Sequence, residues 1–211
     1  MTLEVVHYFD YKSPYAYLAQ APTDKLEAKY RIRIQRVPYT LYIPDFLGAA
    51  ELDATGTDIV GTRSEHQWRR VRYSYMDCRR EANRLGLTIR GPRKIWDSSL
   101  AHIGFLYAHE QDNFRAYHRV VYERFWRREL DIEDIAVLLA VMNETGIDVE
   151  GFTRFAGGSG RELHDELQAK AEAAGIFGVP SWTVNDELFW GSERLGLVEE
   201  AISQIQDSTR R

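Results

Sequence analysis

Ser13 is the residue whose type and position best suit chemistry in this sequence. It directly precedes Pro14, where a β-type apolar run at residues 5–9 gives way to a helical pattern. A serine hydroxyl can cap the first turn of a helix, and proline fits the first helical position because its missing N–H costs nothing there. A hydroxyl at a helix start also lies where the backbone dipole favours negative charge, so it could hold an anion or a thiolate. Capping alone usually explains a Ser-Pro pair, so the rest of the chain must decide between these interpretations.

The cysteine and histidine patterns argue against disulfide and metal chemistry. Cys78 is the single cysteine, so no internal disulfide can form, and we expect a cytoplasmic location. It lies on the apolar stripe of a helix expected at 66–86, which favours a small core residue over a reactive thiol. His102 and His109 are seven residues apart on one expected helix, too far for the four-residue spacing of two metal ligands. We therefore expect no metal site.

Composition limits the class of protein further. The 211 residues are 44% hydrophobic, which is enough for one well-buried core or for one domain with a large insertion. A net charge of −5 argues against nucleic acid as the main partner. No apolar run approaches the roughly 20 residues that a membrane helix needs, and the first residues lack the features of a signal peptide. We expect a small-molecule substrate, with neither nucleic acid nor membrane as a partner.

Hydrophobic periodicity predicts strands at both ends of the chain and helices between them. A strand at 5–9, a helix from 14 that Pro22 should kink or split, and a strand at 32–37 form a β-α-β unit. A long loop follows at 39–66, with one helical turn near 45–52. Helices are then expected at 66–86, 97–110, 112–127, 131–145, 148–156 and 161–174, strands at 181–184 and 187–190, and a last helix at 193–206. We interpret 1–39 with 173–211 as one domain, and 40–172 as a helical domain inserted into it.

Three motifs carry a resemblance to a known family. They are FDYKSPYAYLA at 9–19, GIFGVPSWTVNDELFWGSERL at 175–195 and, more weakly, RVRYSYMDCRREANRLG at 70–86. The whole chain resembles the DsbA-like thioredoxin-fold branch that contains 2-hydroxychromene-2-carboxylate isomerases and kappa-class glutathione transferases. The resemblance implies an α/β fold: a thioredoxin-like mixed sheet (β-α-β … β-β-α) with a large all-helical insertion.

The resemblance also implies glutathione as the cofactor, with two of the motifs forming its central site. Ser13 stands where disulfide-exchanging relatives carry their first cysteine, and its hydroxyl would bond the thiol of glutathione. Pro180 matches the family's cis-proline, which would expose the Val179 backbone to pair with the cysteinyl part of glutathione. A hydroxyl at a helix start agrees with this role, because both features stabilise a thiolate.

Three further residues match positions that would hold the two ends of glutathione. Ser192 and Glu193 match the pair at the start of the last helix that would bind the γ-glutamyl end. Arg70 matches a lysine that would reach the glycyl carboxylate, and a guanidinium can do so with two bonds. The family usually has Asp at position 193 and Lys at position 70, and it often has a G-N-x-P-P stretch where this chain has GTDI at 56–59.

Our leading hypothesis is a glutathione-dependent isomerase of an aromatic or unsaturated carboxylate. The cofactor thiolate would add reversibly to a conjugated carbon, and related enzymes suggest a homodimer. The alternatives are a kappa-class-like glutathione transferase or peroxidase, and a non-catalytic thiol-binding or partner-docking module. Dithiol–disulfide exchange is disfavoured, because Ser13 and Ala16 occupy the positions of the two cysteines that it requires.

Overall fold

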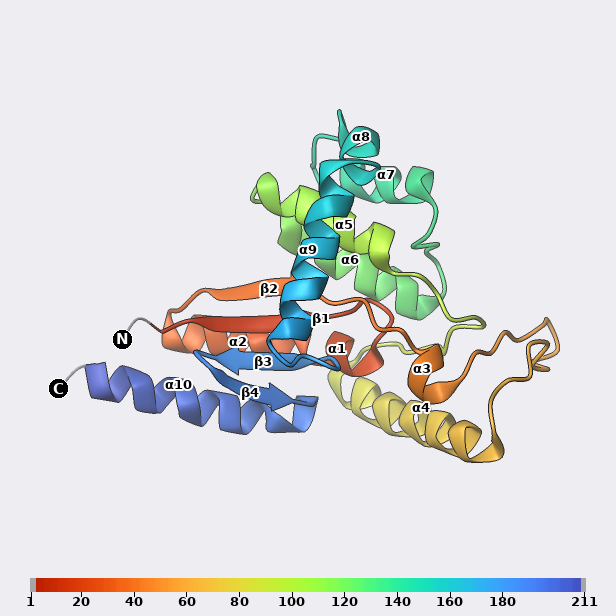
Figure 1. Cartoon of the computed structure of the whole chain (residues 1–211), viewed down its shortest axis with the longest axis horizontal. Coiled ribbons are helices and arrows are strands. Elements are labelled where there is room, and N and C mark those ends of the chain that lie inside the picture. The colour runs from red at the N-terminus through yellow and green to blue at the C-terminus, as the bar shows by residue number, and fades with distance from the viewer. Residues whose placement is uncertain (1–2, 210–211) are drawn as a thin grey trace.

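The computed structural model describes residues 3–209 and is organised around one four-stranded mixed sheet (Figure 1). Its strands are β1 (Val5–Phe9), β2 (Ile34–Pro38), β3 (Ser181–Val184) and β4 (Glu187–Trp190). The spatial order is β2-β1-β3-β4, with β1 and β2 parallel and the other neighbours antiparallel. Both ends of the chain therefore contribute to one sheet, and the predicted thioredoxin-like arrangement is confirmed.

Side chains cover the outer edge of β2 at Ile34. The Ile34 N–H donates to Glu27 Oε1 at 2.8 Å, and the Ile34 carbonyl accepts from Arg36 Nη1 at 3.1 Å. These two backbone groups point away from β1, and the side chains satisfy them where a further strand would otherwise bind.

Pro22 splits the first helical segment, as its position predicts. The chain forms α1 (Pro14–Leu18) and then α2 (Gln20–Tyr30). Proline has no N–H to donate to the carbonyl four residues earlier, so the hydrogen-bond series of one continuous helix fails at this point. Ser13 begins α1, and its side chain accepts a bond from the Ala16 N–H, which confirms the predicted cap.

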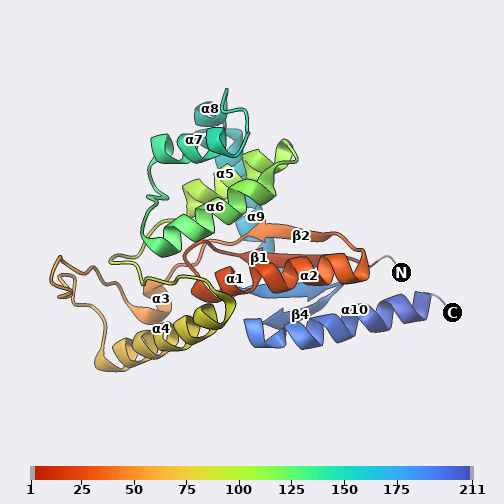
Figure 2. The same cartoon turned by 180° about the vertical axis from the view of Figure 1, so that it is seen from behind.

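Helices connect the two halves of the sheet. They are α3 (Pro44–Leu47), α4 (Glu65–Leu85), α5 (Ser99–Glu110), α6 (Phe114–Arg127), α7 (Ile135–Glu144), α8 (Phe152–Ala156) and α9 (Ser159–Ala173). After β4, a 3-10 turn η1 (Ser192–Arg194) leads into the last helix, α10 (Leu195–Thr209). Figure 1 shows α9 crossing in front of the sheet, and Figure 2, seen from the opposite side, shows α2 covering the other face with α10 alongside β4. No helix within residues 3–209 is long and apolar enough to cross a membrane.

Two hydrophobic clusters hold these layers together. The larger one joins the end of β1 and α1 to the helical block, and Phe9, Tyr11 and Trp126 are among its fully buried members. The smaller one packs α2 and α10 against the sheet around Trp182. The helical block therefore shares its core with the sheet, while the domain boundaries given above stay a prediction. Cys78 is fully buried in the larger cluster, as expected, and burial raises the pKa of its thiol to about 11.

Gly104 in α5 is a test of how closely the helical block packs. A Cβ added there would lie 2.8 Å from Tyr117 Cζ and 2.9 Å from Met142 Cε. We expect Gly104→Ala to lower the free energy of unfolding by about 1–3 kcal/mol, because these buried neighbours cannot move away cheaply. Urea denaturation measures the change.

Gly196 in α10 supplies the matched control, because nothing lies within 4 Å of a Cβ added there. Gly196→Ala should raise the free energy of unfolding by about 0.5 kcal/mol through the reduced entropy of the unfolded chain. Midpoints that shift in the same direction for both variants would contradict the close packing at Gly104.

Candidate active site

A cleft of about 430 Å³ opens where the first helix, α4 and the turn after β4 meet. Its lining residues are Tyr15, Asp77, Val179, Pro180, Trp190, Gly191, Ser192 and Glu193. The Val179–Pro180 peptide bond is cis, as the resemblance implies. Four of the predicted site residues, from segments on either side of the final hairpin, therefore line one cleft.

Ser13 lies beside this cleft rather than on its surface. Its side chain is 5% exposed, and its hydroxyl donates to the Val179 carbonyl at 3.3 Å while accepting from the Ala16 N–H at 3.2 Å. Val179 lines the cleft, so only the residue whose carbonyl it contacts separates the Ser13 hydroxyl from the cleft. The helix that Ser13 begins has only five residues, so its dipole is weaker than that of the longer helix that the sequence suggests.

Arg70 is exposed on α4 and is not among the residues that line the cleft. Asp77, two turns later on the same helix, lines it instead. The Tyr15 hydroxyl donates to Asp77 Oδ2 at 3.0 Å, and Arg80 donates to Asp77 Oδ1 at 3.3 Å. Burial, followed by this bond to Asp77, raises the pKa of Tyr15 above its ordinary value, so Tyr15 stays neutral and acts as a donor. Arg70 and Asp77 are seven residues apart, about two helical turns, so they lie on the same face of α4. This spacing is the sequence signal that could have pointed to Asp77.

Gly191 shapes the side of the cleft that Ser192 and Glu193 form. Its φ of +104° favours glycine, and a Cβ added there would lie 2.7 Å from Glu193 Oε1. The carboxylate of Glu193 is therefore folded back over the turn toward the cleft. Ser192 does not cap α10; it is the first residue of the 3-10 turn η1, which carries both side chains.

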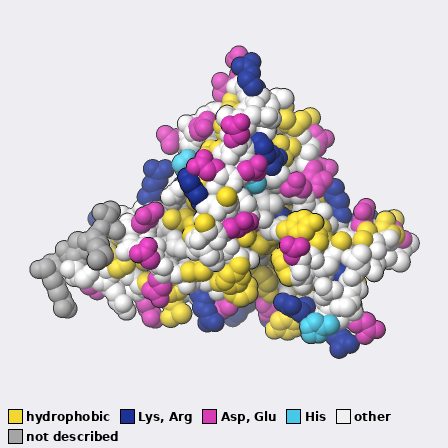
Figure 3. All heavy atoms as spheres, in the orientation of Figure 1, with side chains coloured by type: hydrophobic (Ala, Val, Ile, Leu, Met, Phe, Trp, Pro, Cys, Tyr) yellow, Lys and Arg dark blue, Asp and Glu magenta, His cyan; other side chains and the backbone are white. Residues whose placement is uncertain are grey.

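An exposed aromatic pair lies next to the cleft. Phe177 and Trp190 are each more than half exposed, and their ring centroids are 4.8 Å apart. Gly178 allows this contact, since a Cβ there would lie 2.6 Å from Trp190 Nε1. Figure 3 shows hydrophobic side chains gathered on this face, over the end of β4 and between α9 and α4. A planar apolar group could pack against this surface.

A buried ion pair holds the loop between β1 and Ser13. Lys12 Nζ donates to Asp10 Oδ2 at 2.7 Å and to Ser98 Oγ at 2.8 Å, and the side chains of the ion pair are almost fully buried. Burial alone would raise the pKa of Asp10, but the Lys12 ammonium and then His102 outweigh it and hold this pKa well below its usual range. The carboxylate therefore stays ionised. The sequence does not predict this pair, because charged residues in a loop usually face solvent.

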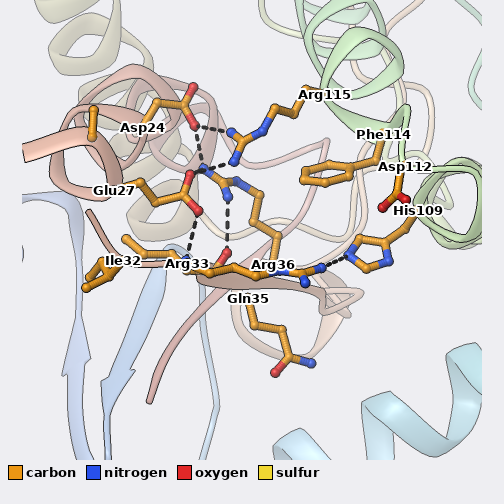
Figure 4. A pocket seen from close by; sticks show the side chains of 12 residues that line it. Asp24, Glu27, Ile32, Arg33, Gln35, Arg36, His109, Asp112, Phe114 and Arg115 are labelled. Atoms are coloured by element: carbon orange, nitrogen blue, oxygen red, sulfur yellow. Dashed lines mark hydrogen bonds and ion pairs between the residues drawn. The ribbon is translucent and has the colours of Figure 1, made fainter. Parts of the chain in front are cut away.

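A second hollow, of about 540 Å³, lies along the outer side of β2 (Figure 4). Its two α2 carboxylates, Asp24 and Glu27, are both bound by Arg36 from β2 and by Arg115 from α6. Figure 4 shows the two guanidinium groups directed at these carboxylates. The network neutralises its own charges and ties the sheet to the helical block, which is a structural role.

The comparisons with known proteins agree with the fold. Residues 4–203 match the family described as "DSBA-like thioredoxin domain". The chain belongs to this family. A solved 2-hydroxychromene-2-carboxylate isomerase superposes on this DsbA-like chain with a TM-score of 0.76 at 25% identity, covering 98% of each chain.

Curated relatives of the DsbA-like chain extend over nearly its whole length. The 2-hydroxychromene-2-carboxylate isomerase of Pseudomonas putida is 28% identical over 203 residues, which cover 94% of this chain and 93% of that protein. The enzyme of the same name from Sphingobium xenophagum is 26% identical, over 94% of this chain and 97% of its own. These relatives support an enzymatic, isomerase-like role. Within residues 3–209, no group of three or more His, Cys, Asp or Glu side chains is placed to hold a metal ion.

Asp10→Asn tests the buried ion pair. The variant leaves the Lys12 ammonium buried without a counter-charge, so we expect the free energy of unfolding at pH 7 to fall by about 3–5 kcal/mol. The folded pKa of Asp10 lies below the unfolded value of about 4, so the carboxylate stabilises the fold fully above pH 4 and loses this effect as the pH falls further. Urea denaturation between pH 7 and pH 3 should show the gap between the native chain and the variant closing.

Asp134→Asn is the control for this experiment. Asp134 caps α7 through the Ala136 N–H at the surface, and asparagine caps equally well, so stability should change little at either pH. A gap for Asp10→Asn that stays constant with pH would argue against an ionised Asp10 in the core.

Proposed function

We propose that this chain is a glutathione-dependent isomerase acting on an aromatic or unsaturated carboxylate, of the 2-hydroxychromene-2-carboxylate type. The relatives that bear this name match along almost the whole chain. The single observation that carries the proposal is the contact between the Ser13 hydroxyl and the Val179 carbonyl at the wall of the cleft. A homodimer and a cytoplasmic location stay predictions.

The cleft has the chemistry to hold glutathione. The cis-peptide segment presents the Val179 backbone, which suits the amide groups of the cysteinyl residue as an added strand would. Asp77 and Glu193 provide carboxylates for the γ-glutamyl ammonium. Arg70, on the α4 face that also carries Asp77, is our candidate for the glycyl carboxylate, and its exposed guanidinium is free to turn toward the end of the cleft.

When bound, glutathione would supply the thiolate that adds to a conjugated carbon of the substrate and leaves again. The chain's part is to keep that sulfur ionised and in place. The Ser13 hydroxyl has one proton, and its bond of 3.3 Å to the Val179 carbonyl is long for an O–H donor. Rotation about the Cβ–Oγ bond can redirect this proton to a sulfur in the cleft, which favours the thiolate and frees the Val179 carbonyl to accept an amide N–H.

Ser13 supports this role as a hydrogen-bond donor rather than as a nucleophile. Its described hydrogen-bond partners are the Ala16 N–H and the Val179 carbonyl, neither of which can remove its proton as a general base would. Dithiol exchange lacks its reactants, because Ser13 and Ala16 replace the two cysteines and Cys78 is buried elsewhere. The exposed Phe177–Trp190 pair offers a surface for an aromatic substrate beside the cleft.

Glutathione itself gives the first test. At about 10 mM it should raise the melting temperature by about 5 °C if its Kd is near 0.1 mM, because it binds the folded chain alone. Arg70→Gln should raise the Kd about tenfold by removing a charged partner of the glycyl carboxylate.

Arg84→Gln is the matched control, because Arg84 lies on the same helix and pairs only at the surface with Glu81. Its glutathione Kd should equal that of the native chain. An unchanged melting temperature with glutathione would overturn the proposed function, and an equal Kd for all three proteins would remove Arg70 from the site.

Ser13→Ala should lower kcat about 10- to 100-fold, the effect expected for loss of one hydrogen bond to a charged group, while glutathione still binds. The assay follows glutathione-dependent turnover of 2-hydroxychromene-2-carboxylate. The variant also loses the cap of α1, which costs about 1 kcal/mol of stability.

Ser64→Ala separates the two effects. Ser64 caps α4 through the Gln67 N–H, so its loss removes a comparable cap away from the cleft. Its kcat should match that of the native chain. Turnover by Ser13→Ala at the native rate would show that the hydroxyl does not act on the thiolate.

A further inference from the structure

An arginine cluster lies where α4, the loop after it and the end of α6 meet. Its members are Arg79 on α4, Arg90 and Arg93 in the loop between α4 and α5, and Arg128, which follows α6. Backbone carbonyls of the loop hold two of them. Arg79 Nε donates to the Ile89 carbonyl at 3.3 Å, and Arg128 Nε donates to the Gly91 carbonyl at 2.7 Å. Because these carbonyls are only two residues apart along the chain, the two guanidinium groups are neighbours.

The positive charges of the cluster act on one another. Partial burial lowers the pKa of Arg128 below its usual value. The charges of Arg93, Arg79 and Arg90 lower this pKa further. The pKa of an arginine is so high that all four side chains still carry their charge at neutral pH. Four like charges are therefore held in one place, which is unfavourable unless a negative charge compensates them.

The chain supplies no such compensation. Within residues 3–209, none of the four arginines forms an ion pair with a carboxylate. Two carboxylates of the same elements and their surroundings are bound elsewhere, Asp77 by Arg80 at 3.3 Å and Glu133 by Lys94 at 2.6 Å. Other arginines of α4, by contrast, pair with carboxylates on their own helix. The cluster is thus positively charged and open to an anion.

Most hydrogen-bond donors of the cluster are available to a ligand. A guanidinium carries five N–H groups. Arg79 uses its Nε and Arg90 uses Nη1, which donates to the Arg127 carbonyl at 3.4 Å. Arg128 uses Nε and Nη2, both on the Gly91 carbonyl, and the Arg93 side chain makes no hydrogen bond in the described part of the chain. All four residues are exposed, so the remaining N–H groups can reach an anion from solvent.

Tyr75 on α4 adds a donor beside the cluster. A Cβ added at Gly91 would lie 3.3 Å from the Tyr75 ring, and Arg79 Cζ lies 5.7 Å from the centroid of this ring. Among the described residues, its hydroxyl has no hydrogen-bond partner. Burial raises the pKa of the phenol, and nearby guanidinium charges only oppose this effect. The hydroxyl therefore stays protonated and can donate.

The cluster is separate from the cleft that Asp77 lines. Tyr75 and Arg79 are each two residues from Asp77, which turns them by about 200° around α4. The group that binds at the cluster is therefore not the one that binds in the cleft.

We propose that the arginine cluster binds a small oxyanion with several negative charges, such as a diphosphate group. A guanidinium can donate two parallel bonds to the oxygens of one phosphate, and arginines from three segments can contact the same group. An anion with one charge would compensate only a quarter of the cluster. A net charge of −5 for the whole chain favours a small ligand over a long nucleic acid. The proposal depends neither on glutathione nor on Ser13.

Calorimetric titration of the full chain with inorganic pyrophosphate tests the proposal. At constant ionic strength, pyrophosphate should bind at least about tenfold more tightly than acetate, because it can contact several guanidinium groups and one hydrogen bond to a charged group contributes about tenfold. Arg93→Gln should raise the Kd for pyrophosphate about tenfold for the same reason. Since the Arg93 side chain makes no described hydrogen bond, this variant should fold as the native chain does.

Arg154→Gln is the matched control, because Arg154 is an exposed arginine on α8, well away from α4 in both views (Figures 1 and 2). Its Kd should equal that of the native chain. Backbone NMR then locates the ligand, and pyrophosphate should shift the amide signals of Gly91 and Arg93. The proposal fails if no saturable binding occurs up to about 10 mM pyrophosphate, if Arg93→Gln binds as tightly as the native chain, or if the shifts are confined to the cleft.

Discussion

The carboxylate of Asp10 is the group on which the geometry around the cleft depends. It accepts hydrogen bonds from the Lys12 ammonium and from the backbone N–H groups of Lys12 and Leu41. The backbone carbonyl of Asp10 accepts two more, from the Ser13 N–H and the Tyr122 hydroxyl. One residue at the end of β1 thus fixes the loop before α1, the chain after β2 and helix α6. Burying a charge is costly, and these bonds offset the cost only while all of them are present.

The strand order explains why a cleft forms next to this group. Because β1 and β3 are antiparallel neighbours, the residues that follow β1 meet those that precede β3, and Tyr8 faces Ser181. Ser13 and the cis Pro180 are therefore brought together although 166 residues separate Ser13 from Val179. The antiparallel partner β4 ends at the same place, where Trp190 faces Ser181, and it delivers the turn that carries Glu193. The contact between Ser13 and Val179 thus follows from the topology.

Local signals predict most of the fold, and long-range contacts account for what the sequence leaves out. The strands, the break at Pro22 and the cap at Ser13 all depend on residues within a few positions of one another, so they can be read directly. The contact between Lys12 and Ser98 spans 86 residues, and that between Thr40 and His164 spans 124. No periodicity records such pairs. The sequence could not predict that Arg70 is exposed, for the same reason. A motif places this residue on a helix, but long-range packing decides which turn of the helix faces the cleft.

The covering of the β2 edge at Ile34 has a consequence for the molecule in a crowded cell. An open sheet edge invites strands of other molecules to add to it, which is a common first step of aggregation. Here Glu27 and Arg36 occupy the outward backbone groups of Ile34, and Arg115 holds Glu27 in position. A neighbouring chain would have to displace a neutralised ion network before it could pair. The same arginines and carboxylates that fasten two layers of one molecule thereby obstruct the addition of a foreign strand at Ile34 of β2.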